Sequence, residues 1–122
     1  MLRGIRGATT VEKNTVEDLK PAVIELLEKI IVLNEIDTVN IASITFTMTA
    51  DLTCAYPAKF AREIDGISNV PLMCYQELNI ENSLEKCIRV LVLLNTSKTQ
   101  KDIKHVYLHK AKNLRPDLYS NP

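Results

Sequence analysis

The apolar positions of the chain follow two periods, one typical of strands and one typical of a helix. Residues 41–49, "IASITFTMT", alternate between apolar side chains and serine or threonine, which predicts a strand with one buried face. The expected buried side consists of Ala42, Ile44, Phe46 and Met48. Residues 19–31 instead place apolar side chains three and four positions apart, which predicts a long amphipathic helix.

The ends of this helix carry their own signals. Thr15 and Asp18 form a capping pattern, and the acidic residue falls in the first turn, where the helix dipole favours it. Asn34 is the expected end. Pro21 lies inside the pattern, where a proline costs about 3 kcal/mol. We therefore expect the helix to bend at Pro21 or to become regular only after it.

Four further segments predict strands and one predicts a short helix. The short helix is expected in "YPAKFAREIDG", with Pro57 in its first turn and Gly66 at its end. Pro71 favours a sheet edge or a strand start. The predicted strands are "LRGIRGATT" at 2–10, "VPLMCYQELNI" at 70–80, "KCIRVLVLLN" at 86–95 and "IKHVYLHKA" at 103–111. These elements predict one α+β domain over residues 1–122, with a mostly five-stranded mixed sheet and a mobile tail from about residue 116.

The strand at residues 86–95 must be covered on both sides. Its core, "CIRVLVLLN", is apolar on both faces apart from Arg89. The chain supplies one long helix, which is enough to cover one face. We therefore expect a second copy of the chain to cover the other face, in a closed homo-oligomeric ring.

Composition narrows the class of protein. The 122 residues carry fifteen basic and fifteen acidic side chains, so the zero net charge gives no bulk attraction to nucleic acid or to an anionic membrane. No stretch reaches the roughly twenty apolar residues of a membrane span, and the first residues lack the apolar core of a secretion signal. Cys54, Cys74 and Cys87 form no C-x-x-C pair. We expect a cytoplasmic protein with reduced thiols, without nucleic acid or membrane as a partner.

Four polar residues lie in otherwise apolar predicted strands: Arg6, Glu77, Arg89 and Tyr107. Two cations, a carboxylate and a phenol on rigid strands suit a polar small molecule, and an arginine among apolar residues requires an anion. Arg89 and Glu77 could equally form a structural ion pair. No phosphate loop, catalytic triad or metal-binding pattern is present. The residues alone thus predict an oligomeric domain without cofactor or metal, with a cationic pocket for a small anion.

Other candidates have simpler explanations when each is taken alone. Lys59 and Arg62, three positions apart in the short predicted helix, usually form an exposed basic face. Cys74 is more often a small buried apolar residue than a nucleophile. His105 and His109, four positions apart in a strand, cannot share one metal ion and are expected at the surface.

Five blocks of sequence resemble the monofunctional, barrel-type chorismate mutase family. They are "RGIRGATTVE", "YPAKFARE", "VPLMCYQEL", "KCIRV" and "HVYLHKAKNLRPDL", in this order and at the family's spacing, from Leu2 to Leu118. The resemblance implies a homotrimer that forms a pseudo-α/β barrel, with an active site in each cleft between subunits. It also implies an isomerase of the shikimate pathway and aromatic amino acid biosynthesis, which converts chorismate to prephenate without a cofactor or a metal.

The resemblance also implies roles for individual residues. Arg89 would lie beside the ether oxygen of chorismate, and Glu77 would accept a hydrogen bond from the ring hydroxyl. Arg6 and Tyr107 would hold a carboxylate. Further implied substrate-binding residues are Met73, Cys74, Tyr75 and Gln76 on one strand, Tyr56, Ala58, Lys59 and Arg62 from the neighbouring subunit, and Leu114 and Arg115 closing over the ligand. Met73 and Tyr56 are departures, since a related member of the family has threonine and phenylalanine there.

Two other functions fit nearly the same residues. One is a non-catalytic trimeric domain that senses a small carboxylate in the same cleft. The other is an enamine or imine hydrolase on a similar trimeric fold, which would also use an arginine to hold a carboxylate. Nucleic-acid binding is disfavoured, because the chain has zero net charge and no exposed aromatic platform is predicted.

Overall fold

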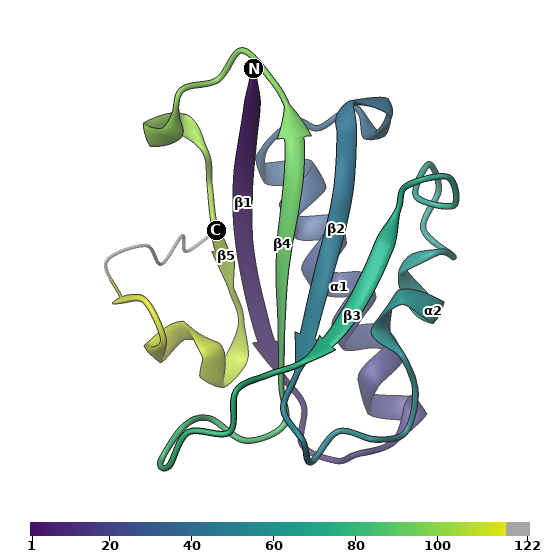
Figure 1. Cartoon of the computed structure of the whole chain (residues 1–122), viewed down its shortest axis with the longest axis vertical. Helices are drawn as coiled ribbons and strands as arrows, with labels where there is room; N and C mark the ends of the chain where they lie inside the picture. The colour runs from purple at the N-terminus through teal and green to yellow at the C-terminus, as the bar shows by residue number, and fades with distance from the viewer. Residues whose placement is uncertain (117–122) are drawn as a thin grey trace.

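A five-stranded mixed sheet forms the centre of the molecule. The computed structural model describes residues 1–116, so most of the expected mobile tail lies outside the described residues. The sheet order is β3-β2-β4-β1-β5, with β4 antiparallel to both β1 and β2, and with β3 and β5 added in parallel at the two edges (Figure 1). The elements are β1 (Leu2–Thr10), α1 (Val16–Leu33), η1 (Thr38–Asn40), β2 (Ile41–Met48), α2 (Pro57–Ala61), β3 (Leu72–Gln76), β4 (Cys87–Asn95), η2 (Gln100–Asp102), β5 (Val106–Tyr107) and η3 (His109–Asn113), where η marks a 3₁₀ helix. This confirms the predicted α+β class and the edge position of the segment after Pro71.

Helix α1 begins and ends where its signals predict. The Thr15 side chain accepts a hydrogen bond from the backbone N–H of Asp18, and Asn34 is the C-terminal cap. The expectation that the helix becomes regular only after Pro21 is wrong, because α1 extends through this residue. Pro21 and Glu17, whose carbonyl would have received the missing N–H, are both exposed, so water can satisfy that carbonyl. Within residues 1–116, no helix is long and apolar enough to cross a membrane.

Strand β2 confirms the alternating pattern except at its start. Ile44 and Phe46 are buried as predicted, but Ala42 is exposed. The pairing with β4 shifts register between Ile41 and Ser43, which is a β-bulge. One extra residue reverses which side chains face the core, so Ile41 is buried in place of Ala42.

The predicted strand over residues 103–111 is wrong in its length. Strand β5 contains only Val106 and Tyr107, which pair with Gly7 and Ala8 of β1. The chain then turns at His109, whose φ of 53° belongs to the left-handed region that strands do not adopt. Helix η3 follows this turn and packs beside the end of β1 (Figure 1).

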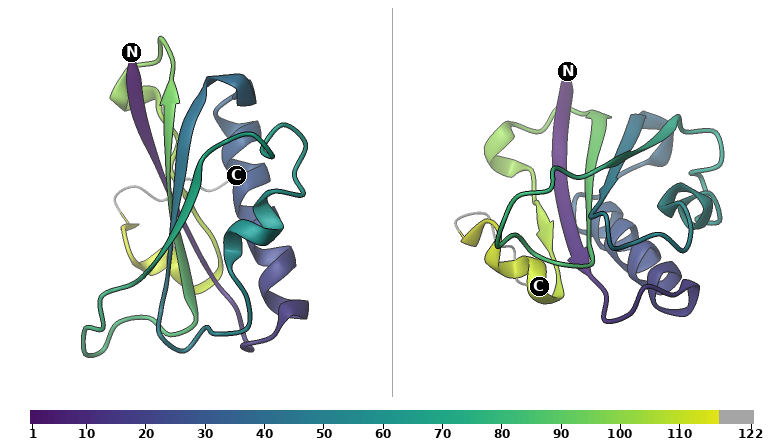
Figure 2. Two further views of the ribbon diagram at one scale, coloured as in Figure 1. Left: turned by 45° about the vertical axis from the view of Figure 1, so that its right-hand side comes forward. Right: turned by 60° about the horizontal axis from the view of Figure 1, so that its bottom comes forward.

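Helix α1 covers one face of the sheet, whereas on the other face the short helix η3 packs only beside Ala8 at the end of β1. Leu26 and Ile30 of α1 pack against β4, and the approach to β1 is close enough to require Gly7, since a Cβ there would lie 2.8 Å from Ile30 Cδ1. On the other side Arg89 and Leu91 are exposed, so a single chain leaves this face of β4 uncovered, as its one long helix predicts. We call this side, which lies away from α1 in Figure 2 (left), the open face. By strand pairing it carries Arg6, Thr45, Thr47, Arg89 and Leu91.

Candidate active site

The register of the sheet places polar residues from three strands side by side on the open face. Antiparallel pairing sets Ala8 opposite Arg89 and Arg6 opposite Leu91, while Thr47 lies opposite Arg89 on the other side of β4. Directly paired residues project from the same face of a sheet. Arg6, Thr47 and Arg89 therefore project to the same side, although they are far apart in sequence.

A cavity on this face contains all four polar residues singled out from the sequence. It has a volume of about 340 Å³, within the range of roughly 300–1,000 Å³ that is typical of small-molecule sites. Its floor is formed by the backbone and small side chains of the central strands. The lining residues are Arg6, Gly7, Ala8, Thr45, Thr47, Glu77, Arg89, Val90, Leu91 and Tyr107. The fold thus brings together the two arginines, the glutamate and the tyrosine that were singled out from the sequence.

Glu77 and Arg89 form an ion pair at the wall of this cavity. Arg89 Nε lies 2.8 Å from Glu77 Oε2, and the side chains retain 44% and 22% exposure. Glu77 follows the end of β3, and its backbone N–H donates to the Met48 carbonyl at 2.8 Å. The structural ion pair considered from the sequence is therefore present. The cavity remains open beside it, so the pair leaves room for a ligand.

Tyr107 is held at the edge of the sheet by short-range pairing and a small apolar cluster. It is buried beside Ala8, and the Leu108 N–H donates to the Ala8 carbonyl at 2.9 Å. Ala8, Tyr107 and Ala111 form this cluster, with Leu84 and Leu114 packed against it. The cluster therefore joins the β3–β4 loop to η3 at the margin of the cavity.

His105 secures the start of β5 to β1. Its Nδ1 accepts a hydrogen bond from the backbone N–H of Arg6 at 2.9 Å. Burial of the ring lowers the pKa of His105, and the positive charges of Arg6 and Arg115 lower this pKa further. A neutral imidazole is the form that can accept at Nδ1, so the surroundings favour the bonded state. The expectation of a plain surface residue is wrong for His105, which is half-buried, and holds for His109, which is exposed.

Cys87 lies two residues before Arg89 on the same side of β4. Burial raises the pKa of the Cys87 thiol to about 11, although the positive charge of Arg89 opposes this rise. The thiol is therefore neutral near pH 7 and is not activated as a nucleophile. Cys54 and Cys74 are also free thiols.

A second group of predicted residues lies away from this cavity in the same chain. Cys74 pairs with Phe46 and packs against the core on the helix-covered side, so Cys74 and Glu77 project to opposite faces. Cys74, Tyr75, Gln76 and the exposed Tyr56 line another cavity of about 230 Å³. The remaining members of this group lie on or next to α2: Ala58 is buried, while Lys59 and Arg62 are exposed. A single chain therefore does not bring this group to Arg89.

The other predicted residues border the open face or the end of the described chain. Met73 and Tyr75 are exposed, pair with Thr45 and Thr47, and the Tyr75 hydroxyl donates to Met73 Sδ at 3.5 Å. Leu114 packs against the cluster of Ala8, Tyr107 and Ala111. Arg115 is half-buried and lies close enough to His105 to lower its pKa.

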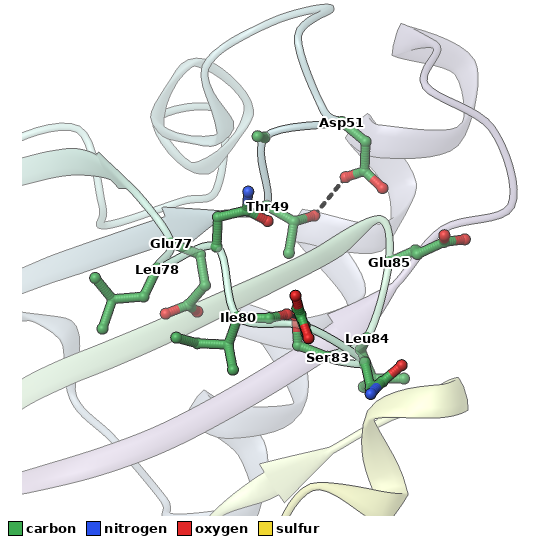
Figure 3. A pocket seen from close by; sticks show the side chains of 12 residues that line it. Thr49, Asp51, Glu77, Leu78, Ile80, Ser83, Leu84 and Glu85 are labelled. Atoms are coloured by element: carbon green, nitrogen blue, oxygen red, sulfur yellow. Dashed lines mark hydrogen bonds between the residues drawn. The ribbon is translucent and has the colours of Figure 1, made fainter.

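The loop after β3 forms a separate cavity on the far side of Glu77 (Figure 3). The cavity has a volume of about 340 Å³ and includes Asp51 and the loop residues 77–85. Burial raises the pKa of Asp51, but hydrogen bonds from the Thr49 hydroxyl and the Lys86 backbone N–H outweigh this effect, so the pKa is lowered overall. Asp51 thereby fixes the start of β4, and with it the strand that carries Arg89.

The chain is similar in sequence to proteins of a known family. The sequence profile of the family "Chorismate mutase type I" matches residues 2–118. The chain belongs to the type I chorismate mutase family. The chorismate mutase AroH of Bacillus subtilis (strain 168) is 45% identical over 118 residues, which cover 97% of this chain and 93% of that protein. The chorismate mutase AroH of Thermus thermophilus is 48% identical over 121 residues, which cover 98% of both chains.

A solved chorismate mutase shares the fold as well as the sequence. The chorismate mutase from Clostridium thermocellum Cth-682 superimposes with a TM-score of 0.87 at 46% identity, covering 90% of this chain and 97% of that chain. The family resemblance proposed from the five sequence blocks is therefore confirmed, and so is the expected fold class.

Sequence reasoning missed Thr47, a residue of the Arg89 cavity that contacts a predicted residue directly. The Thr47 hydroxyl donates to Glu77 Oε2 at 2.9 Å. The sequence signal that could have pointed to Thr47 was its place on the polar side of the alternating strand. Ser43, Thr45 and Thr47 were expected to face away from the core on that side. Alternation cannot identify which hydroxyl on that side meets a partner from β3, because the pairing of the two strands is set by the tertiary fold.

Proposed function

We propose that this chorismate mutase rearranges chorismate to prephenate in the cavity that holds Arg6, Glu77, Arg89 and Tyr107. The observation that carries the proposal is the meeting of these four residues in one cavity of about 340 Å³. Chorismate has two carboxylates, a ring hydroxyl and an ether oxygen. Two guanidinium groups, a phenol and a carboxylate are complementary to these groups.

The reaction is a concerted, unimolecular rearrangement in which the ether C–O bond breaks while a C–C bond forms. It transfers no electrons to the protein and requires no nucleophile or general base. Negative charge develops on the ether oxygen in the transition state. A fixed cation beside that oxygen stabilises the transition state more than the ground state, which accelerates the step. Arg89 is the cation proposed for this role.

Glu77 leaves Arg89 able to do this, because the ion pair joins Glu77 Oε2 to Nε of the guanidinium. A guanidinium has five N–H donors in a planar fork, and the terminal nitrogens carry four of them. The Glu77 carboxylate would accept the hydrogen bond of the ring hydroxyl while it orients Arg89. Arg6 and Tyr107 would hold a substrate carboxylate.

The expected contributions to transition-state stabilisation are large enough to account for catalysis by this site. A million-fold acceleration requires about 8 kcal/mol of transition-state stabilisation. One preorganised donor to a developing oxyanion contributes roughly 3–4 kcal/mol. Holding a flexible substrate in its reactive conformation can supply much of the remainder.

The second group of residues supports a site shared between chains. Tyr56, Ala58, Lys59, Arg62 and Cys74 do not reach Arg89 within one chain, so we propose that a neighbouring subunit supplies them. The exposed apolar residues on and beside the open face support the same assembly, because such a patch requires cover. These residues include Met73, Tyr75 and Leu91. A homotrimer in the cytoplasm, with the open faces turned inward and one site in each cleft, fits the family resemblance.

Leu114 and Arg115 would close over the ligand from the end of the described chain. Leu114 packs against the cluster that includes Tyr107, so the closing segment is attached beside a substrate-binding residue. Met73, Tyr75 and Gln76 would border the same cleft through the backbone of β3. The hydroxyl of Tyr56, which the phenylalanine of a related family member lacks, would lie at the rim of this cleft.

The loss of the ultraviolet absorbance of chorismate tests this function. We expect saturable turnover by the purified protein, with prephenate as the product. Binding of chorismate without turnover would instead support a sensor that uses the same residues. Release of ammonia from an enamine acid, without mutase activity, would support a hydrolase.

A further inference from the structure

Two groups hold the same oxygen of Glu77. Oε2 receives the Thr47 hydroxyl at 2.9 Å and Arg89 Nε at 2.8 Å. The Glu77 carboxylate is thus held through this oxygen by side chains from two different strands, β2 and β4.

The position of Thr47 on β2 explains this arrangement. Thr47 pairs with Arg89 on one side and with Tyr75 on the other, so it lies between the two strands that carry the ion pair. Glu77 is two residues beyond Tyr75 and projects to the same side. Its side chain therefore passes over Thr47 on its way to Arg89.

We propose that Thr47 is a positioning residue for the mutase reaction. Its hydroxyl fixes the carboxylate of Glu77 so that Oε1 faces the ring hydroxyl of chorismate and Oε2 orients Arg89. The inference rests on the proposed function of the Arg89 cavity. Without the Thr47 hydroxyl, Arg89 alone would hold the carboxylate, and a single contact leaves a glutamate free to rotate about its side-chain torsions.

Substitution of Thr47 by valine and by serine separates this role from a structural one. Valine keeps the branched shape that suits a strand and removes the hydroxyl, whereas serine keeps the hydroxyl and loses a methyl group. If Thr47 positions Glu77, Thr47→Val lowers kcat/KM by about tenfold, the scale of one hydrogen bond to a charged group. Thr47→Ser then stays within about threefold of the original enzyme.

A purely structural role predicts the opposite order. Strand propensity and packing favour valine over serine, so Thr47→Ser would lose more activity and thermal stability than Thr47→Val. That order would overturn the proposal, and so would full activity in Thr47→Val. Thr45→Val is the matched comparison, because Thr45 lines the same cavity from the same strand without a bond to Glu77. A loss in Thr45→Val as large as that in Thr47→Val would also contradict the proposal.

A crystal structure of Thr47→Val provides a test that does not depend on activity. We expect the Glu77 carboxylate to occupy more than one position in this variant, while β2 and β4 keep their pairing. A single carboxylate position at 2.8 Å from Arg89 Nε would overturn the positioning role even if the enzyme rearranges chorismate. Absence of turnover by the unchanged enzyme, with a displaced carboxylate in the variant, would instead contradict only the proposed function.

Discussion

At the scale of single residues, the chemistry of the site depends on how Arg89 is placed. Its Nε is paired with Glu77 and its side chain remains 44% exposed, so one part of the guanidinium is fixed and the rest faces a cavity. An arginine buried with a fully satisfied partner would have no capacity for a ligand. An arginine without any partner would lack a fixed orientation. The Arg89 guanidinium therefore has a fixed orientation and remains accessible to a ligand.

Replacement of Arg89 by lysine tests the need for the planar fork. Lysine keeps the positive charge, but its ammonium is a mobile point charge that cannot pair with Glu77 and face the ether oxygen in one geometry. We expect kcat to fall at least tenfold, which corresponds to about 1.4 kcal/mol. Steady-state kinetics with chorismate measure the change. Near-normal turnover by Arg89→Lys, with an intact fold by circular dichroism, would exclude Arg89 from the assigned role.

Gly7 allows the close approach between β1 and α1. A Cβ at this position would lie 2.8 Å from Ile30 Cδ1 and 2.9 Å from Val90 Cγ1. We expect Gly7→Ala to lower the free energy of unfolding by about 1–3 kcal/mol, as overpacked cores do. Urea unfolding measures this change. Gly4→Ala is the matched control: its Cβ would meet Leu91 Cδ1 at 3.3 Å on the open face, and we expect a smaller loss. Equal losses in the two variants would contradict the packing argument.

Among the elements, the central strands carry Arg6 and Arg89, whereas the short strand β5 and the β3–β4 loop bring Tyr107 and Glu77 to them. Strand β5 has two residues, and its attachment includes the bond from Arg6 N–H to His105 Nδ1. The β3–β4 loop is attached to η3 through Leu84, which packs against the cluster containing Tyr107 and Ala111. The central strands β1, β4 and β2, by contrast, pair along most of their length. The rigid part of the sheet therefore positions Arg6 and Arg89, while short elements bring Tyr107 to them.

The attachment of β5 is expected to weaken in acid because of His105. Burial, Arg6 and Arg115 lower the pKa of His105 in the folded chain below its usual value of about 6.5. The unfolded chain therefore binds this proton at a higher pH than the folded chain does. The stability that the neutral ring contributes is present above about pH 6.5 and is lost as the pH falls through the lower folded pKa.

The variant His105→Asn tests whether His105 causes this pH dependence of stability. Asparagine keeps a side-chain acceptor for the Arg6 N–H but does not titrate. We expect the Tm of the original protein to fall more than that of His105→Asn between pH 7.5 and pH 5.5. Both proteins retain His109, so that residue contributes equally to the two curves. Parallel curves would show that His105 is not the titrating group.

In the whole molecule, the two groups of predicted site residues lie on different parts of the surface. One group surrounds Arg89 on the open face, and the other lies around Tyr56, Cys74 and α2. The long helix α1 protects the opposite side of the sheet, as Figure 2 shows. A ring of identical chains can turn every open face inward and set the first group of each chain against the second group of its neighbour.

Mixing two inactive variants tests this shared site. Arg89→Ala removes a residue of the first group and Arg62→Ala removes a residue of the second, so in the proposed homotrimer each variant alone is expected to have low activity. Random mixed trimers, formed by unfolding and refolding the two variants together, contain some clefts in which both halves are intact. For equal mixing, about a quarter of the clefts are intact, so activity should return to about that fraction. No recovery, with mixed trimers confirmed by mass spectrometry, would place both residues in one chain's site.

Much of the fold and of the site follows from local patterns. Capping at Thr15, alternation in β2 and the run from Cys87 to Asn95 predicted elements that the structure contains, because these signals act between neighbouring residues. The bulge at Ala42 and the two-residue length of β5 were not predictable in this way. The bulge depends on pairing with another strand, and β5 ends at Tyr107, two residues before His109 and its left-handed backbone.

Patterns along the chain were enough to predict the charged and phenolic groups of the Arg89 cavity and to identify the family. Arginine, glutamate and tyrosine in apolar strands indicated an anionic ligand, and five ordered blocks identified the chorismate mutase family. How these groups meet could not be read from the chain and depends on the folded sheet. Strand register set Thr47 between Glu77 and Arg89 and turned Cys74 to the opposite face. The physical reason is that composition and spacing act along the chain, whereas a site is made by pairings between residues far apart in it.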